Sequence, residues 1–126
     1  MVSFSAYRCA GIAALLMGVG IAAGAFGAHA LKTRLDPYLL GVYEKAVLYQ
    51  LINSLGLIGV AIAATTFKDD SLLRPALLIV LGVIIFSGTL YGLSLFGQRW
   101  LGAITPLGGS ALIIGWLWLA WILLRK

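Results

Sequence analysis

The chain has 126 residues, of which 62% are hydrophobic and only 10% are charged. In soluble domains, roughly 45–50% of residues are apolar and about 25% are charged. This chain therefore has too few charges to cover a globular surface, and its composition excludes a soluble protein. The net charge of +5 does not indicate nucleic-acid binding, because the nine Lys and Arg residues are spread thinly among apolar segments. The single cysteine, Cys9, excludes an intrachain disulfide, and no spacing typical of a metal site occurs. We therefore expect no metal, no cofactor and no nucleic-acid partner.

Four apolar segments are long enough to cross a membrane: 9–28, 46–66, 75–96 and 106–124. A span needs about 20 residues to cross ~30 Å of hydrocarbon. Such segments must be helices, because lipid offers no partner for backbone polar groups. The connections between them are short, which makes neighbouring helices antiparallel. The sequence therefore predicts an all-α membrane protein, a four-transmembrane-helix bundle of up-down-up-down topology, with residues 1–126 forming a single integral membrane domain.

The first segment has two interpretations. Arg8 precedes an apolar run that ends at Ala28-His29-Ala30, a pattern similar to the cleavage site of a secretory signal. However, the run reaches about 20 residues, longer than the about 7–15 of a signal. It also carries Gly20-x-x-x-Gly24 and Gly27, a spacing typical of a helix-packing face. We expect an uncleaved first helix.

The second helix is predicted to begin before its apolar span, near Pro37, and to continue to about Thr66. An Asp side chain can accept from free N–H groups at a helix start, and Pro suits the first helical position, so Asp36-Pro37 is a good start. Such a helix is roughly 45 Å long at ~1.5 Å per residue and must tilt or bend in a bilayer.

The same helix carries three polar residues on one face: Gln50, Asn53 and Ser54. Polar groups within a span are costly and often mark function, so this face can be a hydrated site or a substrate path. The alternative is interhelical hydrogen bonding that fixes the packing. Amides do not ionise, so a proton relay cannot rest on them alone. We favour the packing interpretation.

Proline and glycine mark the third and fourth helices. Pro75 suits the opening of the third, and Thr105-Pro106 predicts the start of the fourth, with Thr as N-cap. Gly88-x-x-x-Gly92 indicates a close contact between two helices rather than a ligand-binding site. The glycines predicted to serve helix packing are Gly20, Gly24, Gly27, Gly88, Gly92, Gly108 and Gly109.

Basic residues are divided almost equally between the two ends of the predicted bundle. The side with both termini carries five: Arg8, Lys68, Arg74, Arg125 and Lys126. The other side carries four: Lys32, Arg34, Lys45 and Arg99. The positive-inside rule then favours cytoplasmic N- and C-termini. Lys32, Arg34 and Lys45 flank the second helix and are candidates for contact with lipid headgroup phosphates.

Glu44 and His29 are the only plausible acid–base pair. A carboxylate that holds an imidazole can act as a proton shuttle, although two ligands are too few for a zinc site. The alternative places both at the interface, with Glu44 paired to a neighbouring Lys or Arg, and His29 at the end of the first helix, where the dipole favours it. We favour this alternative. No nucleophile–base arrangement occurs, so we expect no enzymatic activity.

Four separate motifs, in order along essentially the whole chain, resemble the YgdD-like family of small four-helix inner-membrane proteins of unknown function. They are Gly24-Ala25-Phe26-Gly27-Ala28-His29-Ala30-Leu31, then Tyr43-Glu44-Lys45-Ala46-Val47 with Tyr49-Gln50, then Ser87-Gly88-Thr89-Leu90-Tyr91, and finally the run from Leu101 to Gly109 before Gly115-Trp116. The resemblance implies a multi-pass bacterial inner-membrane protein and brings no established activity. Family members usually have His-Ala where this chain has Asn53-Ser54, so a function that needs a titrating group there would be absent here.

Two functions remain open. The leading one is a non-enzymatic inner-membrane protein of unknown role that acts by packing against itself as a homo-oligomer, against lipid or against a membrane-protein partner. The alternative is a small transporter or channel that uses the polar face of the second helix with Glu44 and His29. Small multidrug-resistance pumps place an acidic residue in their first helix, and here no acid lies between Cys9 and Ala28. An exposed Glu44 and the lack of a polar cavity around Gln50 would argue against the alternative.

Overall fold

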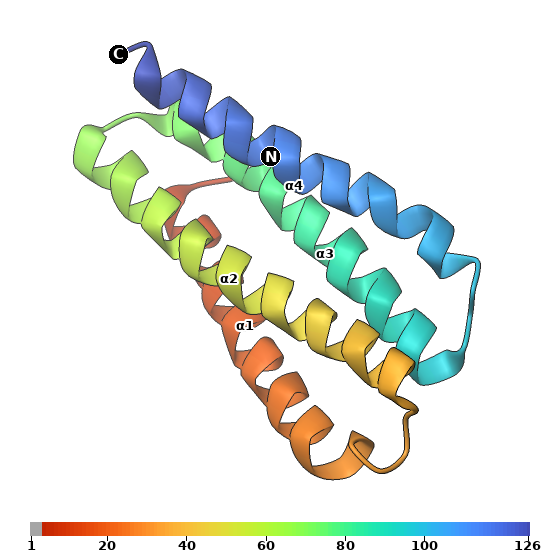
Figure 1. Cartoon of the computed structure of the whole chain (residues 1–126). Coiled ribbons are helices and arrows are strands. Elements are labelled where there is room, and N and C mark those ends of the chain that lie inside the picture. The colour runs from red at the N-terminus through yellow and green to blue at the C-terminus, as the bar shows by residue number, and fades with distance from the viewer. Residues whose placement is uncertain (1–3) are drawn as a thin grey trace.

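The computed structural model describes residues 4–126 and consists of four long helices (Figure 1). They are α1 (Ala6–Phe26), α2 (Pro37–Phe67), α3 (Leu73–Phe96) and α4 (Leu101–Leu124). A π-helical turn, Gly27–Leu31, extends α1, and a 3₁₀ turn, Asp70–Leu72, leads into α3. Consecutive helices run in opposite directions, and no strand occurs in the described part of the chain. The predicted all-α, up-down-up-down architecture is confirmed, and all four helices are long and apolar enough to cross a membrane.

The helices α2 and α3 form the central pair, with α1 packed mainly on α2 and α4 mainly on α3. The apolar core lies where they meet and includes fully buried side chains such as Leu57, Ile79 and Val83. Large apolar side chains elsewhere on α1 and α4 are exposed, among them Leu15 and Leu117. An exposed apolar exterior is what a lipid environment requires of a membrane helix.

The start of α2 agrees with the sequence. Asp36 precedes the helix, and its Oδ1 accepts a hydrogen bond from the backbone N–H of Leu39 at 2.8 Å. Pro37 is the first helical residue. The cap satisfies one of the N–H groups that a helix start leaves without an intrahelical acceptor. Because α2 has 31 residues, it is about 46 Å long at ~1.5 Å per residue and exceeds the hydrocarbon thickness.

The predicted start of α4 at Pro106 is wrong. The helix begins at Leu101, and Pro106 lies inside it. Three tight backbone bonds form the first turn ahead of the proline: Leu101, Gly102 and Ala103 each donate to the carbonyl three residues before, all at 3.1 Å. Thr105 is consequently not an N-cap, and its hydroxyl bonds the Leu101 carbonyl at 3.1 Å. Transmembrane helices tolerate such a proline where side chains and local 3₁₀ bonds satisfy the backbone.

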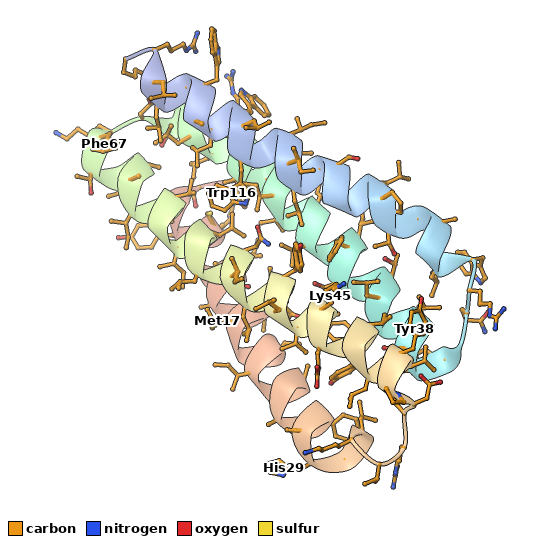
Figure 2. All side chains as sticks on the ribbon, in the orientation of Figure 1. Met17, His29, Tyr38, Lys45, Phe67 and Trp116 are labelled. Atoms are coloured by element: carbon orange, nitrogen blue, oxygen red, sulfur yellow. The ribbon has the colours of Figure 1, made fainter. Side chains whose placement is uncertain are left out.

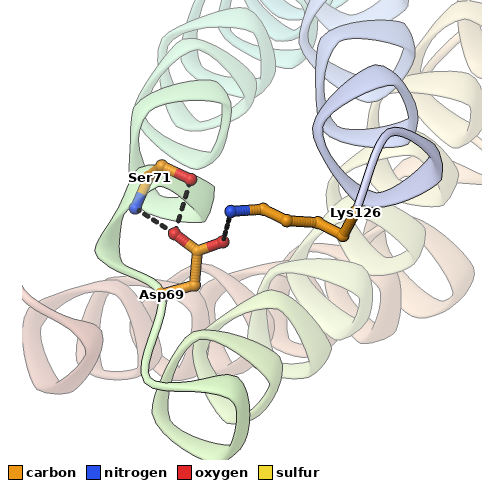
Figure 3. Close-up of polar contacts among 3 residues, drawn as sticks. All are labelled: Asp69, Ser71 and Lys126. Atoms are coloured by element: carbon orange, nitrogen blue, oxygen red, sulfur yellow. Dashed lines mark hydrogen bonds and ion pairs between the residues drawn. The ribbon is translucent and has the colours of Figure 1, made fainter.

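The C-terminus is tied to the turn between α2 and α3 (Figure 3). The Asp69 carboxylate accepts from the Ser71 hydroxyl at 2.6 Å and from the Ser71 N–H at 3.0 Å, and Lys126 Nζ lies 3.0 Å from Asp69 Oδ2. The hydrogen bonds from Ser71, followed by the contact with Lys126, lower the pKa of Asp69 from 3.8 to about 2. This arrangement holds the end of α4 against the start of α3.

Glycines allow close approach at two helix interfaces. Gly20 and Gly24 of α1 and Gly27 of the π-helical turn face α2, where an added Cβ would press on side chains of that helix, including the Tyr43 ring at Gly27. On α4, a Cβ at Gly108 would collide with the backbone of Phe86 in α3. Backbone cannot rotate away, so the α3–α4 contact depends on Gly108 being a glycine.

The other predicted packing glycines differ from one another. A Cβ at Gly92 would collide with Leu101, whereas one at Gly109 would make only ordinary contact with the Phe86 ring. Gly88 faces open space, with nothing within 4 Å of the position that a Cβ would take, so it does not serve packing within this chain. Three further glycines at close contacts were not predicted: Gly56, Gly82 and Gly115.

Candidate functional site

The polar face of α2 points into the junction of the helices. Gln50, Asn53 and Ser54 are 3%, 5% and 0% exposed. Positions i, i+3 and i+4 lie on one side of a helix, which explains why the three side chains are buried together. Their hydrogen-bond partners decide whether this face can act on a ligand or only holds the helices together.

Gln50 connects three helices. Its Nε2 donates to the Leu16 carbonyl of α1 at 2.8 Å, and its Oε1 accepts from the Tyr91 hydroxyl of α3 at 2.6 Å. The side-chain amide thus uses both of its ends on protein groups. A glutamine at this position can bridge neighbours on both sides because one amide carries both a donor and an acceptor.

Two tyrosines and a serine surround this bridge. The rings of Tyr43 and Tyr91 meet edge to face, with their centroids 5.3 Å apart. The Tyr43 hydroxyl donates to the Ala23 carbonyl of α1 at 2.5 Å. Ser87 of α3 donates to the Ala46 carbonyl of α2 at 2.7 Å. Each bond joins two different helices, so the cluster sets how α1, α2 and α3 pack.

Asn53 ties α2 to α4. Its Nδ2 donates to the Tyr49 carbonyl one turn earlier, at 2.8 Å, and its Oδ1 accepts from the indole Nε1 of Trp116 at 2.7 Å. Gly56 makes room for the Trp116 ring, which reaches from α4 toward α2 (Figure 2). Ser54 donates to the Gln50 carbonyl at 2.5 Å, within its own helix. The sequence indicated the polar side chains but not Trp116 as a partner, because an indole amid apolar residues looks like simple packing.

The polar interior is fully bonded. The hydroxyls of Thr89 and Thr105 lie 2.7 Å apart between α3 and α4, and the thiol of Cys9 lies 3.6 Å from the Leu57 carbonyl. Across residues 4–126, no buried side-chain nitrogen or oxygen lacks a partner. A shallow groove of about 180 Å³ passes beside Gln50, and its walls are mainly apolar. These polar groups therefore stabilise the packing of the helices, because burying a polar group is unfavourable unless hydrogen bonds replace those it made with water.

His29 and Glu44 do not pair with each other, which is the less favoured interpretation of these two residues. Both are exposed, and in the described part of the chain neither side chain makes a hydrogen bond or an ion pair, with the other or with a neighbouring cation. His29 lies in the π-helical turn at the end of α1 and points away from the bundle (Figure 2). Glu44 borders a small hollow of about 230 Å³ between α1 and α2.

The remaining candidates lie at the surface. Lys32, Arg34 and Lys45 are exposed, the first two in the α1–α2 turn and the third near the start of α2. Among residues 4–126, no group of three His, Cys, Asp or Glu side chains is arranged to hold a metal ion. The residues that sequence analysis grouped into a site are thus divided between a bonded interior and separate positions at one end of the bundle.

Comparison with known proteins identifies relatives along most of the chain. Residues 23–109 match a family model described as "Protein of unknown function (DUF423)". A UPF0382 membrane protein of Staphylococcus haemolyticus is 44% identical over 108 residues, covering 86% of this chain and 88% of the relative. The UPF0382 membrane protein YwdK of Bacillus subtilis is 42% identical over 103 residues, covering 81% and 82%. No solved structure matches the chain. With four membrane-length helices and these relatives, the chain belongs to the DUF423 (UPF0382) family of membrane proteins, whose function is unknown.

Proposed function

We propose that the protein is a non-enzymatic, multi-pass protein of the bacterial inner membrane that acts through contacts of its surface with lipid, with another copy or with a membrane-protein partner. It corresponds, on this proposal, to the YgdD-like family, and both termini face the cytoplasm. The five-to-four distribution of basic residues and the bacterial origin of the relatives support this placement.

One observation supports contact over transport: the buried polar side chains form their hydrogen bonds with backbone carbonyls and side chains of the bundle itself. Gln50 has both amide ends engaged, and Asn53 likewise donates and accepts within the protein. A transport path needs polar groups that can exchange partners with a substrate or with water. Using Gln50 in that way would break the contacts that join α1, α2 and α3.

The exposed positions of Glu44 and His29 support the same conclusion. Glu44 is exposed rather than buried in the helix junction, and it makes no hydrogen bond or ion pair with His29. Catalysis would need a nucleophile with a positioned base, and the chain offers one histidine and one cysteine, the latter buried at the α1–α2 contact.

Exposed cations at one end of the bundle support lipid contact. We place Lys32, Arg34 and Lys45 at the headgroup level, where each basic residue near an anionic surface contributes about 1 kcal/mol. Replacing all three with Gln is expected to reduce the anionic lipid that co-purifies with the protein. Unchanged retention would exclude these contacts.

The experiment that tests the proposed function is a flux assay in proteoliposomes. Proton-coupled movement of ions or cationic dyes is measured for the native chain and for Glu44→Gln and His29→Ala. We expect no flux above that of empty liposomes in any sample. Flux that the native chain supports and that either variant abolishes would overturn the proposal and assign the protein to the transporter class.

A further inference from the structure

A cleft lies at the end of the bundle opposite the C-terminus, where the start of α2 meets the end of α3 and the α3–α4 turn. Its volume is about 590 Å³, and its walls include Asp36, Tyr38, Leu39, Leu93 and Arg99. We call it the end cleft. We propose that the end cleft binds a phospholipid whose headgroup carries a phosphate and a primary ammonium. This inference goes beyond the proposed function, because it assigns a ligand chemistry to one site and does not require any protein partner.

Two residues of opposite charge, Asp36 and Arg99, line the end cleft and form no ion pair with each other. The Asp36 carboxylate uses Oδ1 to cap α2, which leaves Oδ2 to accept from a ligand. The Arg99 guanidinium makes no hydrogen bond or ion pair with any residue from 4 to 126, Asp36 included. A carboxylate and a guanidinium that line one cleft without pairing can bind a ligand that carries a positive and a negative group at separate positions.

The chemistry of these groups selects the headgroup. A guanidinium binds phosphate oxygens through two parallel N–H donors. A carboxylate oxygen accepts hydrogen bonds from a primary ammonium, whereas a trimethylammonium has no N–H to donate. Tyr38 is the aromatic residue among those that line the cleft, and its side chain is 71% exposed. One ring does not make the aromatic cage that quaternary ammonium ligands need. The pair Asp36 and Arg99 therefore favours an ethanolamine-type headgroup over a choline-type one.

The position of the end cleft matches the depth of a lipid headgroup. It lies at the ends of membrane-length helices, and Tyr38 stands at the start of α2 beside the end of α3 (Figure 2). Tyrosine is enriched at this interface, where its polar hydroxyl and apolar ring both find suitable surroundings. Leu39 and Leu93 provide apolar walls that can lie along the first part of the acyl chains.

Glycine keeps the end cleft open. Gly97 ends α3 with φ of 66°, a left-handed conformation that favours glycine, and nothing lies within 4 Å of the position its Cβ would occupy. The turn to α4 therefore passes the cleft without a side chain at this point. A headgroup can thus approach the backbone of the turn as well as Arg99.

Native mass spectrometry of the full, delipidated chain in mild detergent tests the inference. Phosphatidylethanolamine, phosphatidylcholine and phosphatidylglycerol with identical acyl chains are titrated separately. Asp36→Asn removes the charge but keeps the helix cap, because Asn is as good an N-cap as Asp. Arg99→Gln removes the phosphate donor, and Arg125→Gln, at the opposite end of the bundle, is the matched control for the loss of one positive charge.

We expect the native chain to bind phosphatidylethanolamine at least about tenfold more tightly than phosphatidylcholine, because one charge-assisted hydrogen bond lowers Kd by at least that factor. Asp36→Asn should remove this preference, Arg99→Gln should weaken all three lipids, and Arg125→Gln should change none. Equal binding of the two zwitterionic lipids by the native chain would overturn the inference. A loss of lipid affinity in Arg125→Gln as large as that in Arg99→Gln would also overturn it.

A soluble competitor distinguishes a lipid from a free metabolite with the same headgroup. Phosphoethanolamine carries the two charges without acyl chains. We expect it to displace bound phosphatidylethanolamine only at far higher concentration, because it lacks contact with Leu39 and Leu93. Displacement at concentrations equal to that of the lipid would show that the end cleft recognises a soluble ligand and would overturn the lipid assignment.

Discussion

Replacing Gln50 with leucine is expected to lower the free energy of unfolding by about 2 kcal/mol. Gln50 makes two interhelical bonds, one to the Leu16 carbonyl and one from the Tyr91 hydroxyl. Interhelical hydrogen bonds in membrane proteins average about 0.6 kcal/mol each. The substitution also leaves the hydroxyl of the half-buried Tyr91 without its acceptor, which adds roughly 1 kcal/mol. Leucine fills a similar volume, so the loss reports the bonds rather than a cavity.

The assay is unfolding in mixed micelles of increasing denaturing detergent, followed by helical circular dichroism. Gln98→Leu is the matched control, because Gln98 is exposed in the α3–α4 turn and its side chain accepts only from Trp100 at 3.2 Å. We expect the control to stay within about 0.5 kcal/mol of the native chain, as surface substitutions usually do.

A double-mutant cycle with Tyr91→Phe isolates the bond between Tyr91 and Gln50. The double variant should cost less than the two single variants combined, by about 0.6 kcal/mol or more, because it leaves neither group without a partner. Effects that add within about 0.3 kcal/mol would show no coupling between the two side chains. That result, or a neutral Gln50→Leu, would refute the assignment of Gln50 as the bridge between helices.

Two further predictions concern packing and pH. Gly108→Ala should destabilise the fold by about 1–3 kcal/mol, because the new Cβ would collide with the Phe86 backbone. Gly88→Ala places its Cβ in open space and should be neutral or slightly stabilising. Equal losses of stability for the two variants in the same unfolding assay would contradict this prediction. Asp69→Asn should lower Tm at neutral pH by removing the contact with Lys126. Because the folded pKa of about 2 lies below the ordinary 3.8, the Asp69 contribution is complete above the ordinary value and disappears as pH falls through the folded one. A Tm difference that persists below pH 2 would count against this account.

Features that depend on local chemistry could be read from the sequence. The start of α2 follows from Asp36-Pro37, since a cap and a first-position proline act within a single turn. The number of helices follows from the length of the apolar runs. The packing interpretation of Gln50 and Asn53 also agrees with their bonded, buried positions.

Features that depend on how helices are placed relative to one another could not be read in this way. The bond between Gln50 and Leu16 needs the register of α1 against α2, and Trp116 reaches Asn53 only because Gly56 leaves space for its ring. The pair of His29 and Glu44, the less favoured of the two interpretations, is not formed: both side chains are exposed, and neither bonds to the other.

Competition between two local signals explains the wrong start of α4. Thr105-Pro106 has the residues of a helix start, yet backbone bonds between residues 98 and 103 begin the helix earlier. The end cleft was missed because its charged residues, Asp36 and Arg99, come from two turns that lie far apart in the sequence. Only the folded bundle brings them to one place.

The accessibility of Ser54 to water shows whether the polar interior only holds the helices together or also forms a path across the membrane. In a Cys9→Ala background, Ser54→Cys is nearly isosteric and places a thiol at a position that is 0% exposed. Asp70→Cys, exposed in the α2–α3 turn, is the control. In membrane vesicles open to a hydrophilic maleimide on both sides, we expect rapid labelling of the control and none at position 54 until the protein is unfolded. Labelling of position 54 in the folded protein at a rate close to that of the control would contradict it.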